Sequence, residues 1–197
     1  MLVRLVAAFE RYLRLLIRDA IEEWSKKATN FERLPSGLAS RNLVLSGRVI
    51  SNSDLPREHI KVDLTDIVDN LLTCRRGSTV FKLNSLAFMT QVTGVTPEII
   101  RNALKLVQVE NWIDAVGDDA PLKTHLDCKR TADATKKIET KLKDLSRWRN
   151  NWAHGGDDEI ALTCDDLLQS LRFLKLFGSA LDRTVFKRIQ AADLTRS

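Results

Sequence analysis

The feature that most constrains this chain is the spacing of apolar residues over residues 2–27. They recur at steps of three and four residues, as Leu2, Leu5, Phe9, Leu13, Leu16, Ile17, Ala20, Ile21 and Trp24. This spacing places one apolar stripe along a helix of about 3.6 residues per turn. It predicts a long amphipathic helix packed on a core or on a second copy, with a membrane-surface helix as the alternative.

Two more long helices are predicted near the C-terminus. Residues 130–154 carry a stripe of Ala134, Ile138, Leu142, Leu145, Trp148 and Trp152. After Gly155-Gly156, Thr163 and Asp166 resemble a capping box, which starts a helix at its N-terminal end. The inward residues predicted for this last helix are Leu167, Leu168, Leu171, Leu174, Phe177, Leu181 and Val185.

The remaining chain reads as shorter helices and connections. Helices are predicted over residues 63–74, 82–92 and from Thr96 onward, and residues 114–122 read as a loop. The segment 28–62 is predicted to be a less regular connection that could hold a short helix or an extended piece. With only 8 Gly and 4 Pro in 197 residues, a turn-rich β architecture is disfavoured. We therefore predict a single all-α domain over residues 1–197, a helical bundle with a long N-terminal helix and two long C-terminal helices.

Composition excludes several classes of protein. No apolar run approaches the roughly 20 residues that span a bilayer, and arginines interrupt the first apolar stretch, so neither a membrane protein nor a signal peptide is expected. Cys74, Cys128 and Cys164 are far apart and form no CxxC, which argues against disulfides and zinc and favours a cytoplasmic location. No metal or cofactor is expected. The net charge of +5 permits a polyanionic partner without requiring one.

One segment contains candidate catalytic residues, at the predicted end of the helix over residues 130–154. It reads Arg147-Trp148-Arg149-Asn150-Asn151-Trp152-Ala153-His154-Gly155-Gly156. On a helical wheel the two tryptophans continue the apolar stripe, which predicts that they are core residues. Arg147, Asn150, Asn151 and His154 lie on the opposite side, and Asn150 can contact the His154 imidazole one turn later.

These residue types suit cleavage of an RNA phosphodiester without a metal. The negative end of the helix dipole favours a protonated His154, which can then move protons near neutral pH. Arginine is a permanent cation whose forked donors match phosphate oxygens. Arg149 and His154 are about 140° apart on an ideal helix, so two copies related by a twofold axis would supply both groups to one cleft more easily than one copy.

The motif Arg149-Asn150 followed by Ala153-His154-Gly155 resembles the RNxxAHG signature of the HEPN superfamily, and the helical layout looks most like the prokaryotic RiboL-PSP-HEPN type. The resemblance implies an all-α homodimer with metal-independent endoribonuclease activity in a shared cleft. It implies a role as a toxin or in antiviral and abortive-infection defence, controlled by an antitoxin or another partner protein. Arg149, His154 and Asn150 would be the catalytic residues, with Arg147 and Asn151 as auxiliary phosphate-binding residues.

Two alternatives stay open at this level. Arg147 also fits the spacing of the motif arginine, and either arginine could instead pair with Asp144 or Asp157 at an ordinary polar helix end. The chain could also be a non-catalytic HEPN-like module that binds a partner protein, RNA or a nucleotide.

Overall fold

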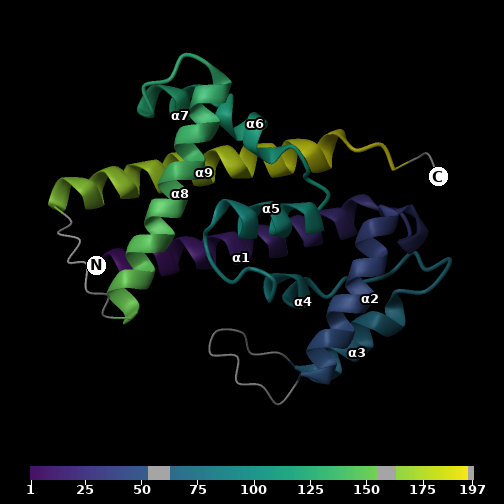
Figure 1. The fold of residues 1–197 in the computed structure, drawn as a ribbon. Helices are drawn as coiled ribbons and strands as arrows, with labels where there is room; N and C mark the ends of the chain where they lie inside the picture. The colour runs from purple at the N-terminus through teal and green to yellow at the C-terminus, as the bar shows by residue number, and fades with distance from the viewer. Residues whose placement is uncertain (53–62, 155–162, 195–197) are drawn as a thin grey trace.

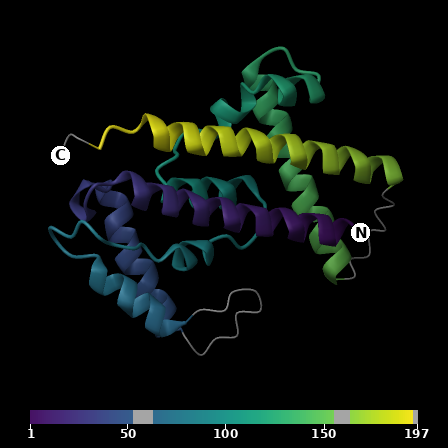
Figure 2. The same cartoon turned by 180° about the vertical axis from the view of Figure 1, so that it is seen from behind.

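The computed structural model describes residues 1–52, 63–154 and 163–194, with Ala153 and His154 described as backbone only. Two long helices, α1 (Leu2–Lys27) and α9 (Cys164–Ala191), lie side by side and run in the same direction. A third, α8 (Thr131–His154), crosses both of them (Figures 1 and 2). The described chain contains helices and no strands, so the all-α prediction is confirmed.

The apolar stripe of α1 is the centre of the core, as predicted. Leu5 is half-buried, and the other predicted positions are buried together with Val6. The Tyr12 hydroxyl lies 2.7 Å from the Gly178 carbonyl oxygen and 2.8 Å from an Asp182 carboxylate oxygen, both on α9. Burial and then this hydrogen bond to Asp182 raise the pKa of Tyr12 well above its usual range. The two helices are therefore tied together by a buried polar contact as well as by apolar packing.

The start of α9 follows the predicted capping box. The Thr163 hydroxyl accepts a hydrogen bond from the Asp166 backbone N–H, and the Asp166 carboxylate accepts one from the Thr163 backbone N–H. Further along, a Cβ on Gly178 would lie 3.3 Å from the Tyr12 ring, so glycine allows the two helices to approach closely. The prediction that Leu168 and Leu171 point inward is wrong, because each is 49% exposed in the first turns of α9.

The loop predicted over residues 114–122 is also wrong. The chain forms α6 (Trp112–Gly117) and α7 (Ala120–His125), with Asp119 as the N-cap residue of α7. Burial of apolar side chains outweighs the local turn signals here, since Trp112 and Val116 are fully buried. A Cβ on Gly117 would lie 2.6 Å from the Thr135 side chain, which explains how α6 packs so closely on α8.

The described part of the segment 28–62, residues 28–52, is more regular than predicted. It contains η1 (Phe31–Arg33) and the 16-residue helix α2 (Ser36–Ser51), which packs against α3 (Leu64–Thr73) and α4 (Ser85–Met89). No strong apolar stripe marks α2 in the sequence. Leu38, Leu45 and Val49 of this helix are buried in the core, and Asn42 and Ser46 belong to a buried polar network.

Asn84 is the hub of that network. Its backbone N–H donates to Asn42 Oδ1 at 2.8 Å, and its side-chain amide donates to Ser46 Oγ at 2.8 Å and to the Ile67 carbonyl at 3.1 Å. Asn70 completes the network by donating to Asn84 Oδ1 at 2.9 Å. Buried polar groups cost little only when they are hydrogen-bonded, so this network specifies how α2, α3 and α4 meet.

The other predicted helices are confirmed, although the one predicted over residues 82–92 is helical only over Ser85–Met89. α5 (Pro97–Leu106) begins at its predicted N-cap residue Thr96, whose hydroxyl accepts from the Ile99 backbone N–H. Across the described helices, none is long and apolar enough to cross a bilayer.

Candidate functional site

The motif lies in the last two turns of α8, where the helix passes beyond α1 (Figures 1 and 2). Helical structure continues to His154, as predicted. The side chain of His154 and the residues Gly155 and Gly156 lie outside the described part of the structure. The predicted convergence of Arg149 and His154 therefore stays a prediction.

The two candidate arginines have different surroundings. Arg147 donates from Nη2 to the Asp144 carboxylate at 3.1 Å, an exposed ion pair one turn apart on α8. Arg149 forms no ion pair with any carboxylate that the structure describes. Arg149 instead lines a hollow between α8 and α1. Arg149 is thus the arginine whose charge is available to a ligand, whereas the charge of Arg147 is partly compensated.

The two asparagines of the motif also differ. Asn150 is exposed, and its Oδ1 accepts a hydrogen bond from Arg149 Nη1 at 3.2 Å. Asn151 is half-buried. In this structure Asn150 therefore contacts Arg149, and its predicted contact with His154 falls on a side chain that is not described.

The hollow beside Arg149 has a volume of about 670 Å³. Its lining consists of one face of α1, the last residue of α4 and the motif arginine: Ala7, Ala8, Glu10, Arg11, Arg14, Leu15, Met89 and Arg149. Arg14 is held in place, since its Nε donates to the Val92 carbonyl at 3.0 Å and its guanidinium pairs with Glu10. Arg11 is exposed and forms no ion pair within the described chain.

The two tryptophans of the motif separate at the end of the helix. Trp148 is half-buried against the core, in line with the prediction. Trp152 is 60% exposed, so its assignment to the core is wrong. The apolar stripe continues along the sequence to Trp152, but α1 does not cover it there, because the last turn of α8 extends beyond α1 (Figure 1).

The sequence model of the RiboL-PSP-HEPN family matches residues 1–186 of this chain. The chain belongs to the RiboL-PSP-HEPN family. The family resemblance predicted from the motif is therefore confirmed, as is the HEPN-type helical fold. No curated protein and no solved structure matched the chain significantly.

Other candidate chemistry of this RiboL-PSP-HEPN chain is sparse in the described ranges. No group of three or more His, Cys, Asp or Glu side chains there could hold a metal ion. Cys74, Cys128 and Cys164 are free thiols. Burial raises the pKa of the Cys74 thiol, which disfavours the nucleophilic thiolate.

A second group of cations lies around His125, at the end of α7. Burial, followed by the positive charges of Lys141 on α8 and Arg172 on α9, lowers the pKa of His125 at the end of α7. The Lys141 ammonium also lies 5.7 Å from the centre of the Phe173 ring. This cluster is accounted for by packing of α7, α8 and α9.

Sequence reasoning missed Arg11 and Arg14 as neighbours of the motif. A signal for Arg11 was present: no acidic residue lies three or four positions away from it, whereas Arg18 has Glu22 one turn later. A cation on a helix without a local carboxylate partner is a candidate for binding something else. That α1 would bring this cation to Arg149 could not be read from spacing within either helix.

Proposed function

We propose that this protein is a metal-independent endoribonuclease that cleaves RNA through attack of a ribose 2′-OH on the adjacent phosphorus. The attack forms a 2′,3′-cyclic phosphate, and the bond from phosphorus to the 5′-oxygen breaks. His154 moves protons between the 2′-OH and the leaving 5′-oxygen. Arg149 binds the phosphate and offsets the charge that builds up on it, and Asn150 holds a catalytic side chain in place.

The observation that carries this proposal is the setting of Arg149. It belongs to an RNxxAHG motif in a RiboL-PSP-HEPN chain, it lacks a carboxylate partner in the described residues, and it faces a ligand-sized hollow. An arginine in an ordinary polar helix end would be paired, as Arg147 is with Asp144. The unpaired charge supports a site that binds an anion.

We further propose that two copies form the active dimer through the end of the molecule where α1 begins, α8 ends and α9 begins (Figure 2). Met1, Trp152, Leu168 and Leu171 are exposed apolar side chains on these element ends. Exposed apolar groups gathered around a functional motif favour an interface. A twofold contact there would bring two copies of the motif together, which the spacing of Arg149 and His154 on the helical wheel favours.

The first experiment tests the reaction. Purified protein is incubated with RNA in EDTA, and the product ends are analysed for 2′,3′-cyclic phosphate. Wild type is expected to cleave, and His154→Ala to lose activity by about 100-fold or more, the usual contribution of a general acid or base. Cleavage that needs a divalent ion, or that survives the substitution, would refute the mechanism.

The second experiment tests the dimer. Analytical ultracentrifugation should give the mass of two chains for the wild type, and Trp152→Glu together with Leu171→Glu should give one chain and loss of cleavage. Leu43→Glu is the matched control, since Leu43 is equally exposed on α2, far from the motif. A wild type that cleaves RNA as a monomer would contradict the shared cleft.

A role as a toxin or in antiphage defence follows from the activity in this proposal. Expression of the wild type should arrest bacterial growth, and His154→Ala should relieve the arrest. Full growth of cells that contain active, soluble enzyme would argue against a toxin that acts on its own and would favour a triggered defence protein.

A non-catalytic module that binds a partner protein is the second candidate function. It is favoured by the exposed apolar side chains of α2 and α3, which include Leu43, Val44, Val68 and Leu72. This alternative is preferred if the wild type cleaves no RNA from a varied pool while Leu72→Glu abolishes binding to a co-purifying protein.

A further inference from the structure

The hollow between α1 and α8 is positively charged as well as ligand-sized. Its lining contains three arginines, Arg11, Arg14 and Arg149, and one acidic residue, Glu10. Glu10 is already paired with Arg14. Two positive charges, on Arg11 and Arg149, are left without a described carboxylate partner. Two forked cations beside one cavity suit one or two phosphate groups.

The rest of the lining is small or apolar. Ala7 and Ala8 present only methyl groups on α1, while Leu15 and Met89 add larger apolar side chains. A phosphate gains nothing from contact with apolar side chains, but a nucleobase can pack on them. A volume of about 670 Å³ falls within the range of small-ligand pockets. The lining therefore has a cationic part that suits the phosphate of a nucleotide and an apolar part that suits its base.

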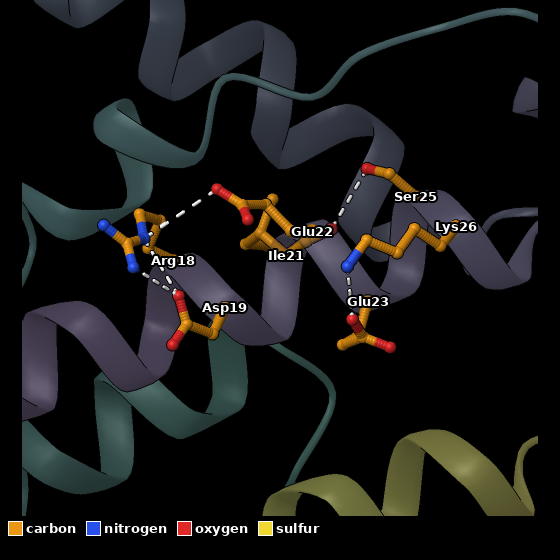
Figure 3. Close-up of polar contacts among 7 residues, drawn as sticks. All are labelled: Arg18, Asp19, Ile21, Glu22, Glu23, Ser25 and Lys26. Atoms are coloured by element: carbon orange, nitrogen blue, oxygen red, sulfur yellow. Dashed lines mark hydrogen bonds and ion pairs between the residues drawn. The ribbon is translucent and has the colours of Figure 1, made fainter.

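The second half of α1 provides a contrast on the same helix. Arg18 donates to Asp19 at 2.8 and 2.9 Å and lies 3.8 Å from Glu22, and Lys26 donates to Glu23 at 2.6 Å (Figure 3). These cations are neutralised within their own helix. Arg11 is not, so its charge is directed to the surroundings of the hollow.

A larger hollow of about 860 Å³ elsewhere in the described structure has a different charge pattern. It lies between the second half of α9 and the turns around α6, and its cations face as many carboxylates: Arg183, Lys187 and Arg188 against Glu110, Asp118 and Asp119. Arg183 and Asp119 are paired with each other. Asp118 is paired with Lys123 outside the lining, and the lining as a whole holds no excess of cations over carboxylates, unlike the hollow between α1 and α8.

We propose that the hollow between α1 and α8 binds the nucleotide next to the scissile phosphate of a single-stranded RNA. Arg11 holds the phosphate of that nucleotide, and its base lies on the wall formed by Ala8, Leu15 and Met89. Arg149 lies between this subsite and the reaction centre and so fixes the register of the strand. That the ligand is RNA rests on the proposed function, whereas the position of the site rests on the hollow itself.

The binding test uses an RNA that cannot react. Fluorescein-labelled 12-nucleotide 2′-O-methyl oligouridylate and oligoadenylate lack the attacking 2′-OH, so anisotropy titrations report binding alone. Arg11→Ala is expected to weaken binding roughly tenfold and to lower the slope of log K against log salt by about 0.7, the loss of one phosphate contact. Arg48→Ala is the matched control, an exposed arginine on α2 away from the hollow, and should leave both values unchanged.

A second variant fills the hollow without changing charge. Ala8→Leu adds an apolar side chain to an exposed helical position, so the fold should tolerate it. It is expected to weaken binding while leaving the salt slope at the wild-type value, because the phosphate contacts remain. Ala132→Leu, at an exposed position in the first turn of α8, is the control for the added bulk.

The outcomes separate this proposal from the proposed function. If the wild type cleaves RNA but Arg11→Ala and Ala8→Leu bind and cleave normally, the subsite is refuted and the nuclease stands. If no RNA is cleaved but Arg11→Ala lowers the salt slope, the subsite stands in a protein that only binds RNA. If the wild type does not bind the oligonucleotides, or Arg48→Ala loses as much as Arg11→Ala, the subsite is overturned.

Discussion

The two halves of α1 use the same residue types for different purposes. In the second half, Arg18 and Lys26 pair with acids on their own helix, and Lys27 donates to the Ile189 carbonyl oxygen of α9 at 2.7 Å. In the first half, Arg14 pairs with Glu10, but Arg4 and Arg11 form no ion pair with any carboxylate in the described ranges. The difference shows that a charged helix face can hold the fold together along one stretch and remain available for a ligand along another.

The motif end of α8 extends this comparison to catalysis. Arg147 and Arg149 are two residues apart, yet only the first is paired. We expect Arg149→Ala to lower the rate of RNA cleavage by about 100- to 1,000-fold, the usual loss when one group that stabilises a transition state is removed. Arg147→Ala should lower it by less than about tenfold, because its charge is already shared with Asp144.

Single-turnover cleavage rates, measured with both variants at saturating enzyme, check this prediction. Thermal unfolding of each variant is the control for folding. Equal losses for the two arginines, or a larger loss for Arg147→Ala, would show that Arg149 is not the motif arginine.

Tyr12, which follows Arg11 on α1, is expected to matter for stability. Tyr12 donates its hydroxyl hydrogen within a half-buried contact to Gly178 and Asp182. Tyr12→Phe removes the donor and leaves acceptors without it, so we expect a loss of about 1–3 kcal/mol in the free energy of unfolding. Urea denaturation measures this, and RNA binding per folded molecule should not change. An unchanged midpoint would mean that water replaces the hydroxyl at no cost.

Removing a single cation from each half of α1 is expected to change the free energy of unfolding by less than Tyr12→Phe does, and the two halves are expected to respond differently. Arg18→Ala should destabilise the fold by about 0.2–1 kcal/mol, since it breaks exposed ion pairs. Arg11→Ala should leave stability unchanged or slightly increased, because it removes repulsion from the other cations of the hollow. The two values are compared by urea denaturation at low and high salt, and the gap should shrink at high salt. Equal destabilisation by both variants would erase the distinction between the halves.

The smallest expected effect concerns the cationic cluster around His125, which packing alone explains. Burial and the charges of Lys141 and Arg172 lower the pKa of His125 in the folded protein. The unfolded chain then binds more protons than the folded one below about pH 6.5, so stability contributed by the neutral ring falls as pH drops. His125→Gln should lose less of its melting temperature than wild type between pH 7 and pH 5.5. A parallel decline in both proteins would show that other groups cause it.

Much of the fold was predictable because its signals are local. The stripe of α1, the Thr96 and Thr163 caps and the course of α8 follow from spacing within about one turn of chain. Where burial overrides local signals, prediction failed. Trp112 and Val116 form α6 in a segment rich in turn residues, and α2 depends on hydrogen bonds from Asn84, more than thirty residues away.

The sequence by itself determined the long helices α1, α8 and α9 and the position of the RNxxAHG motif at the end of α8, because periodicity and caps act over a few residues. Only the tertiary structure decided that Trp152 and Leu171 face outward and that Arg11 of α1 meets Arg149 of α8 across one hollow. The reason is physical: a helix fixes which residues share a face, but what that face meets depends on how far each neighbouring helix extends and at what angle it crosses.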